Sequence, residues 1–205
     1  MRWIIAALFI LAARGASAQV SEPWSVASPD THTAIAVERQ PDGRLVWRVT
    51  RDAQPVLMDS PMGIRRADQA FDAGLTFVSA SPVRNIDEHY TMPHGKRHDH
   101  HVVGRERTLT FANAAGAKLE VIIRAHDDGV AFRYRFPETA EGVKTVVEER
   151  TGFHVPPRAL AWMLPHQEVS KYGPAYEDFF TEASAGTRAP RPDGWSFPAL
   201  FRTVS

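Results

Sequence analysis

The sequence predicts an all-β fold, an antiparallel β-sandwich, from three observations. Apolar and polar residues alternate with a period of two over many short segments, which is the pattern of half-buried strands. Glycine, proline and aspartate separate these segments at short intervals, as in sandwiches and barrels. Beyond the first residues no stretch carries a sustained apolar stripe at helical spacing, and residues 174–183 would form at most a turn or two of helix.

The first strand pair is expected at residues 34–38 and 45–49. The Asp-Gly pair at 42–43 lies between them, and this dipeptide favours a tight reversal of the chain. Alternate side chains of a strand point to the same face, so the second strand should bury one set. That set is Leu45, Trp47 and Val49.

Three consecutive strands are expected between Thr108 and Phe136. They occupy 108–111, 118–124 and the segment that follows the Asp-Gly pair at 128–129, with a turn at 113–116 between the first two. The third strand should turn Val130, Phe132, Tyr134 and Phe136 to the core, with Arg133 and Arg135 on the solvated or interface face. Asp127 and Asp128 are interpreted as turn residues. Alternation returns at 143–149.

The composition is that of an ordinary globular protein. Of 205 residues, 43% are hydrophobic and 23% charged, and the formal net charge is zero. No strong field therefore favours nucleic acid or an anionic membrane as a partner. The chain has no cysteine, so a metal site would have to use histidine and carboxylate ligands.

The first 18 residues have the three-part pattern of a secretory signal. Arg2 precedes an apolar run from Trp3 to Ala13, and the small residues Ala16 and Ala18 follow. We expect cleavage after Ala18 and export to the periplasm or the medium, with residues 19–205 as one domain.

The C-terminal segment should leave the sandwich incomplete. A new strand is expected to start at Leu200, and aromatic residues continue almost to the last position. Domains usually end in polar residues that fray, so we expect a piece of something longer.

Residues 92–101, MPHGKRHDHH, contain four histidines. If this segment is a strand, His98 and His100 share one face while Asp99 and His101 share the other, so four ligands cannot converge. A third ligand for either pair would have to come from elsewhere, for instance His94 or His89. The spacing matches no helical or finger-type metal motif, which favours a strand or interface surface over a metal site.

Several motifs taken together resemble the N-terminal domain of glycoside hydrolase family 97, exported bacterial α-glucosidases and α-galactosidases. They are the segment from Ser28 to Ile64, DDGVAFRYRFP at 127–137, Ala161-Trp162, Tyr176-Glu177 and FPALF at 197–201. Their order and spacing make the resemblance specific.

The resemblance implies a large sandwich of the mutarotase-like, super-sandwich kind. It also implies a C-terminal (β/α)8 barrel, absent from this chain, that supplies the catalytic acid and the base or nucleophile. The expected partners are that barrel and an α-linked oligosaccharide or α-galactoside, and the expected cofactor is calcium, shared with the barrel. No catalytic residue is assigned here, so this chain alone should not hydrolyse sugars.

The resemblance also suggests site residues. Glu177, at the Tyr-Glu motif, would be a calcium ligand because calcium prefers hard oxygen donors; Glu168 is the alternative. His98 and His100 would face the substrate or the interface. Trp162 could stack on a sugar, although a tryptophan in an apolar run is more often a core residue.

Two other functions stay open. A free-standing periplasmic carbohydrate-binding module would need measurable sugar affinity without a barrel, and an unpaired last strand would leave it an exposed edge. A histidine-based metal-binding protein would rest on residues 92–101 alone.

Overall fold

The computed structural model describes residues 23–139, 142–170 and 178–203, and all regular elements in these ranges are strands. The strands pair antiparallel throughout, which confirms the predicted all-β, antiparallel fold. No helix in these ranges is long and apolar enough to cross a membrane. The predicted signal segment lies outside the described residues.

The first layer is a four-stranded sheet in the order β1-β2-β3-β4. Its strands are β1 (Trp24–Ala27), β2 (Thr33–Arg39), β3 (Leu45–Arg51) and β4 (Gln54–Met62). The predicted pair at 34–38 and 45–49 is confirmed as β2 and β3. At their turn Gly43 has φ +78°, and a Cβ there would come within 2.5 Å of the Leu75 backbone, so the turn requires glycine.

The second layer contains the predicted meander. Its strands are β7 (Thr76–Ala80), β8 (Arg84–Thr91), β9 (Asp99–Ala112), β10 (Lys118–His126) and β11 (Gly129–Arg135). The order is β11-β10-β9-β7, and β8 also pairs with β9. The strand expected at 108–111 is the end of the longer β9, whose first half pairs with β8 and whose last residues pair with β7.

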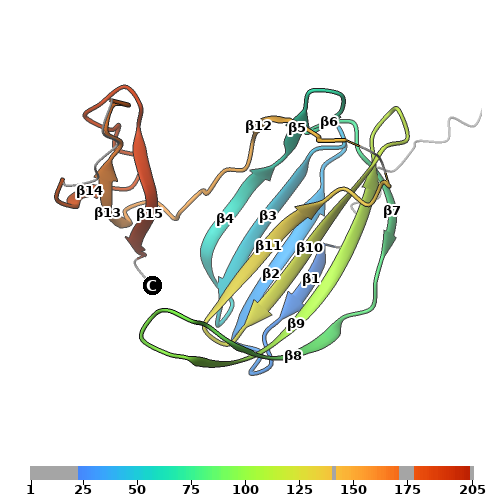
Figure 1. Cartoon of the computed structure of the whole chain (residues 1–205), viewed down its shortest axis with the longest axis horizontal. Coiled ribbons are helices and arrows are strands. Elements are labelled where there is room, and N and C mark those ends of the chain that lie inside the picture. Colours follow the sequence, from blue (N-terminus) through green and yellow to red (C-terminus); the bar gives the residue numbers. More distant parts are fainter. Residues whose placement is uncertain (1–22, 140–141, 171–177, 204–205) are drawn as a thin grey trace, which may run out of the picture.

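The two layers pack face to face around one apolar core (Figure 1). The predicted inward face of β3 is confirmed, since Leu45, Trp47 and Val49 are buried. The second layer contributes the buried residues Leu109, Phe111, Leu119, Val121 and Ile123. Side chains on the predicted inward face of β11 pack against this core, and Arg133 and Arg135 are exposed, as expected.

A small sheet closes one end of the sandwich. It pairs β5 (Ile64–Arg66) with β6 (Ala70–Phe71) and β12 (Val146–Glu149), so the strand expected at 143–149 starts three residues later. Arg66 is buried there, with its guanidinium 4.6 Å from the Phe136 ring centre and bonded to the Asp68 carboxylate at 2.8 and 2.6 Å. These contacts hold the end of β11 against the core.

The last three strands form a separate sheet beside the sandwich (Figure 1). They are β13 (Leu160–Pro165), β14 (Thr181–Ser184) and β15 (Trp195–Arg202), in the order β14-β13-β15. Residues 181–183 are thus strand rather than the helical turn considered for 174–183. The strand expected from Leu200 begins five residues earlier, at Trp195.

Candidate functional site

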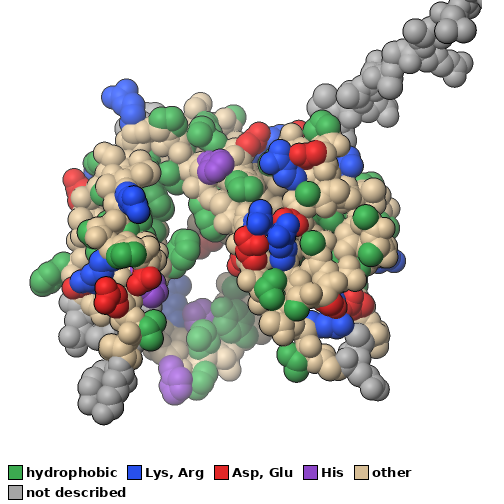
Figure 2. Space-filling model, turned by 90° about the horizontal axis from the view of Figure 1, so that it is seen from above, with side chains coloured by type: hydrophobic (Ala, Val, Ile, Leu, Met, Phe, Trp, Pro, Cys, Tyr) green, Lys and Arg blue, Asp and Glu red, His purple; other side chains and the backbone are tan. Residues whose placement is uncertain are grey.

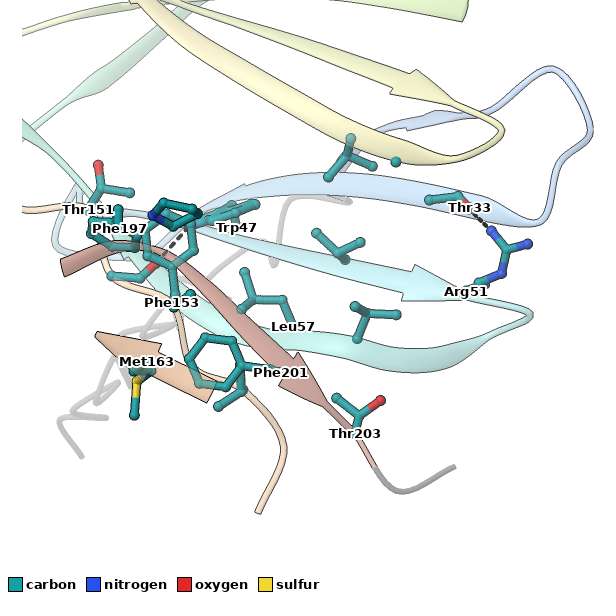
Figure 3. A pocket seen from close by; sticks show the side chains of 18 of the residues that line it. Thr33, Trp47, Arg51, Leu57, Thr151, Phe153, Met163, Phe197, Phe201 and Thr203 are labelled. Carbon is teal, nitrogen blue, oxygen red and sulfur yellow. Dashed lines mark hydrogen bonds between the residues drawn. The ribbon is translucent and has the colours of Figure 1, made fainter. Parts of the chain in front are cut away.

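A cleft of ≈ 890 Å³ separates the β13–β15 sheet from the edge of the sandwich (Figure 3). Figure 2 shows the hollow between these two parts from above, with apolar side chains on its walls. Its lining comes from β2 to β4, the β10–β11 turn, the segment 151–155, β13 and β15. Prominent among the lining residues are Trp47, Val56, Leu57, Phe153, Met163, Phe197 and Phe201.

Trp47 connects the cleft to the core. Its ring meets Phe132 edge-on at 4.9 Å between centres and Phe153 at 5.4 Å, and its Nε1 donates to the Gly152 carbonyl oxygen at 3.2 Å. Phe153 in turn lies 6.0 Å from Phe197 across the cleft. A row of aromatic rings therefore runs from the core to β15.

A second contact holds the segment that forms one wall of the cleft. The Tyr134 hydroxyl accepts a hydrogen bond from the Gly63 backbone N at 3.0 Å and is bonded to the Thr151 hydroxyl at 2.8 Å. Burial raises the pKa of Tyr134, so the hydroxyl stays neutral and keeps both bonds. Tyr134 of β11 thus holds Thr151, and Trp47 of β3 holds the next residue, Gly152.

The described residues that line the cleft are largely apolar. Arg51, which also lines the cleft, donates to the Thr33 hydroxyl at 2.9 Å and to the Asp127 carbonyl oxygen at 3.1 Å. Asp128 is the one carboxylate among the described residues that line the cleft, whereas glycoside hydrolysis needs two that face each other. Phe197, a large apolar side chain on the wall of the cleft, is 80% exposed.

The β8–β9 hairpin carries the predicted residues His98 and His100. His98 is exposed, and its Nδ1 lies 3.0 Å from the Asp99 carboxylate. His100 is half-buried and stacks on Tyr90, with 4.9 Å between ring centres. Neither histidine lines the cleft.

Trp162 lies on β13 and is half-buried. Its neighbour Met163 lines the cleft, and alternation along the strand turns Trp162 to the other face. There the Arg202 guanidinium lies 5.6 Å from the centre of a Trp162 ring. The structure therefore does not bring Trp162 together with the aromatic residues of the cleft.

Glu168, one of the two predicted calcium ligands, is not among the residues that line the cleft. Glu168 is exposed just after β13. Glu177 lies outside the described residues. The only group of three or more metal-ligating side chains found among the described residues is on the β8–β9 hairpin and does not include Glu168.

One polar feature was missed by the sequence reasoning. Arg84, Glu106 and Arg124 lie directly opposite one another across β8, β9 and β10, on the face away from the core. Glu106 is 5% exposed and accepts from Arg84 at 2.5 Å and from Arg124. Burial opposes the charge on Glu106, but the bonds from Arg124 and Arg84 prevail and lower its pKa. Only the strand register could have revealed this row.

The described residues therefore form an all-β protein of the antiparallel sandwich class, with a largely apolar cleft at the edge of the sandwich. The sequence pattern described as Glycosyl-hydrolase 97 N-terminal matches residues 26–205. The chain belongs to this family, as its motifs predicted.

Relatives agree with this assignment. The chain is 31% identical over 183 residues to a probable retaining α-galactosidase of Streptomyces bingchenggensis, covering 88% of this chain and 27% of that protein. The crystal structure of a β-arabinopyranosidase matches with a TM-score of 0.79 and 30% identity, over 87% of this chain and 29% of the other.

A family 97 enzyme from Pseudoalteromonas sp. strain K8, solved in complex with acarbose, shares the fold with a TM-score of 0.64 at 21% identity. That match covers 78% of this chain and 24% of the enzyme. The chain therefore spans 24% to 29% of the length of these three relatives, less than a third in each case.

Proposed function

We propose that this chain is the N-terminal accessory domain of an exported, calcium-dependent glycosidase of family 97. The observation that carries the proposal is the family match over residues 26–205. The catalytic acid and the base or nucleophile would come from a C-terminal (β/α)8 barrel. The secretory pattern of residues 1–18 supports export.

The cleft supports an accessory role because its lining suits protein better than sugar. A sugar presents hydroxyl groups all around its ring, and a site for it needs several converging polar side chains. Here the wall is largely aromatic and aliphatic, and Arg51 is already bonded within the domain. We infer that the rest of the enzyme covers this surface.

For the substrate we propose a galacto-configured glycoside. The two relatives described above at 30% and 31% identity bear names that fit this class, β-arabinopyranosidase and α-galactosidase. A β-L-arabinopyranoside has the ring configuration of an α-D-galactoside and lacks only its hydroxymethyl group. An α-glucoside is the alternative, since the Pseudoalteromonas enzyme was solved with panose and with acarbose.

Calcium would be bound by Glu177, with Glu168 as the alternative ligand. A glutamate carboxylate is a hard oxygen donor, as calcium requires. Glu168 is exposed and belongs to no ligand cluster within the described residues, so the remaining ligands would come from the barrel. The same proposal places His98 and His100 at the substrate side or at the domain interface.

The test is an assay of the complete gene product. Hydrolysis of p-nitrophenyl α-galactoside, faster than that of the α-glucoside and lost when calcium is chelated, would support the proposal. Calorimetry of this chain with melibiose and maltose is the companion experiment. Tight sugar binding by this chain, together with a gene that encodes no barrel, would instead support a free-standing carbohydrate-binding module.

A further inference from the structure

Three metal-ligating side chains of the β8–β9 hairpin lie close together. The antiparallel register places His89 directly opposite His101, and Asp87 lies two residues before His89 on the same strand. Side chains that are opposite each other or two residues apart share one face of a sheet. One ligand atom from each of Asp87, His89 and His101 lies within 4.8 Å of the other two.

The distances suit a single small cation. Asp87 Oδ1 lies 2.8 Å from His101 Nε2 and 3.4 Å from His89 Nε2. Three ligands about 2.1 Å from a tetrahedral zinc ion lie about 3.4 Å from one another. The His89 and His101 rings stack with 4.0 Å between their centres and 12° between their planes, so both exposed rings must turn about their side-chain bonds to direct one nitrogen each to a shared ion.

We propose that Asp87, His89 and His101 bind one divalent transition-metal ion, with Zn²⁺ as the best match. Imidazole nitrogen suits zinc, copper and nickel, whereas calcium takes oxygen ligands. Two histidines and a carboxylate leave the fourth position of a tetrahedral ion open. All three side chains are exposed, so water or a ligand from outside the domain can reach that position.

The place of the site in the fold gives the metal a structural effect. Along β8 only Ile86 is buried, so few apolar contacts hold this strand beyond its pairing with β9. The hairpin also projects past the end of the sandwich (Figure 1). An ion held by His89 and His101 would cross-link β8 and β9 and restrain the hairpin. This metal is independent of the proposed calcium, and neither proposal requires the other.

The site also answers a question that the sequence left open. Residues 92–101 alone could not supply a third ligand to the face of His101, and His94 and His89 were both possible contributors. The register selects His89 and adds Asp87. His94 lies in the loop between the strands and is absent from the cluster.

The test is a zinc titration of the complete chain, made without a histidine tag. Binding is measured by isothermal titration calorimetry in a buffer that contains calcium. One equivalent of zinc should bind at micromolar concentration. His101→Ala and Asp87→Asn should each weaken binding by at least about tenfold, as expected for the loss of a ligand. His94→Ala is the matched control and should bind as the unmodified chain does.

Cobalt gives a second measurement, because its absorption spectrum reports the ligands of the ion directly. Co²⁺ in this site should show the visible absorption of a four-coordinate ion, and the band should vanish in His101→Ala. Circular dichroism of the metal-free variants should match that of the unmodified chain. The proposal is overturned if zinc shows no saturable binding, if His101→Ala binds normally, or if His94→Ala loses as much affinity as His101→Ala.

Discussion

The Trp47 indole nitrogen donates a hydrogen bond to the Gly152 carbonyl oxygen at 3.2 Å, which joins the middle of β3 to a segment more than a hundred residues later. Trp47 is 5% exposed and also meets Phe132 and Phe153 edge-on. This one side chain therefore belongs both to the core and to the wall of the cleft.

Two substitutions of Trp47 should separate the contribution of its buried ring from that of its hydrogen bond. Trp47→Ala should cost about 3–5 kcal/mol through lost burial and a cavity. Trp47→Phe retains an aromatic ring but leaves the Gly152 carbonyl without its donor, and should cost about 1–2 kcal/mol. Urea unfolding followed by fluorescence and circular dichroism measures both. A Trp47→Phe variant as stable as the unmodified chain would contradict a contribution from the hydrogen bond, and equal costs for the two variants would contradict a contribution from burial of the ring.

The row of Arg84, Glu106 and Arg124 predicts a pH dependence of stability. Bonds from the two arginines lower the folded-state pKa of Glu106 from its ordinary value of 4.5. This stabilisation is present above the unfolded-state pKa and is lost as the pH falls through the folded-state pKa. Glu106→Gln should cost about 2 kcal/mol at neutral pH, less than a fully buried pair, because Arg84 is largely exposed.

The measurement for Glu106 is the free energy of unfolding of both proteins between neutral and acidic pH. The difference between them should shrink as the pH falls below the ordinary glutamate range. Glu182→Gln, an exposed carboxylate on β14, is the control and should leave the profile unchanged. A difference that is independent of pH would show that the Glu106 charge does not stabilise the fold.

The calcium proposal predicts different behaviour for two nearby glutamates. In the complete enzyme Glu177→Gln should weaken calcium binding by at least about tenfold and lower activity in parallel, since a ligand is lost. Glu168→Gln should leave both unchanged. Calcium titration monitored by calorimetry and activity decides the matter. The reverse result would assign the ligand to Glu168, and no effect of either change would remove calcium binding from this domain.

The two histidines proposed for the substrate side predict a loss of binding. The double change His98→Ala, His100→Ala in the complete enzyme should raise KM for the α-galactoside severalfold with little effect on kcat, since these groups do not perform the chemistry. Steady-state kinetics provides the measurement. Unchanged KM together with unchanged domain docking in limited proteolysis would refute this role.

The cleft predicts that one exposed valine is covered in the complete protein and another is not. Val56 on β4 lines the cleft and is 40% exposed, whereas Val147 on β12 lies outside it and is 60% exposed. If the rest of the enzyme packs on the cleft, Val56→Asp should lower the melting temperature of the complete enzyme more than Val147→Asp does, because a charge is then buried without a partner. Equal shifts would indicate that the cleft stays open.

Some strands were predictable from local sequence and others were not. The hairpins β2–β3 and β9–β10–β11 follow from alternation and from turns that contain glycine. Strand β4 escaped prediction because two register shifts in its pairing with β3 break the period of two. Strand β8 escaped because only Ile86 on it is buried, so its sequence lacks an apolar period.

The sequence by itself determined the all-β class, the central hairpins, the inward face of β3 and the family of the chain, because these depend on neighbours within a strand or on motif order. Tertiary structure decided the rest. The cleft joins residues of β3 and β4 to residues of β15, and alternation within a strand carries no information about which distant strands meet. The pairing of His89 with His101 likewise depends on the register of β8 against β9, and a shift of one residue would turn His89 to the opposite face.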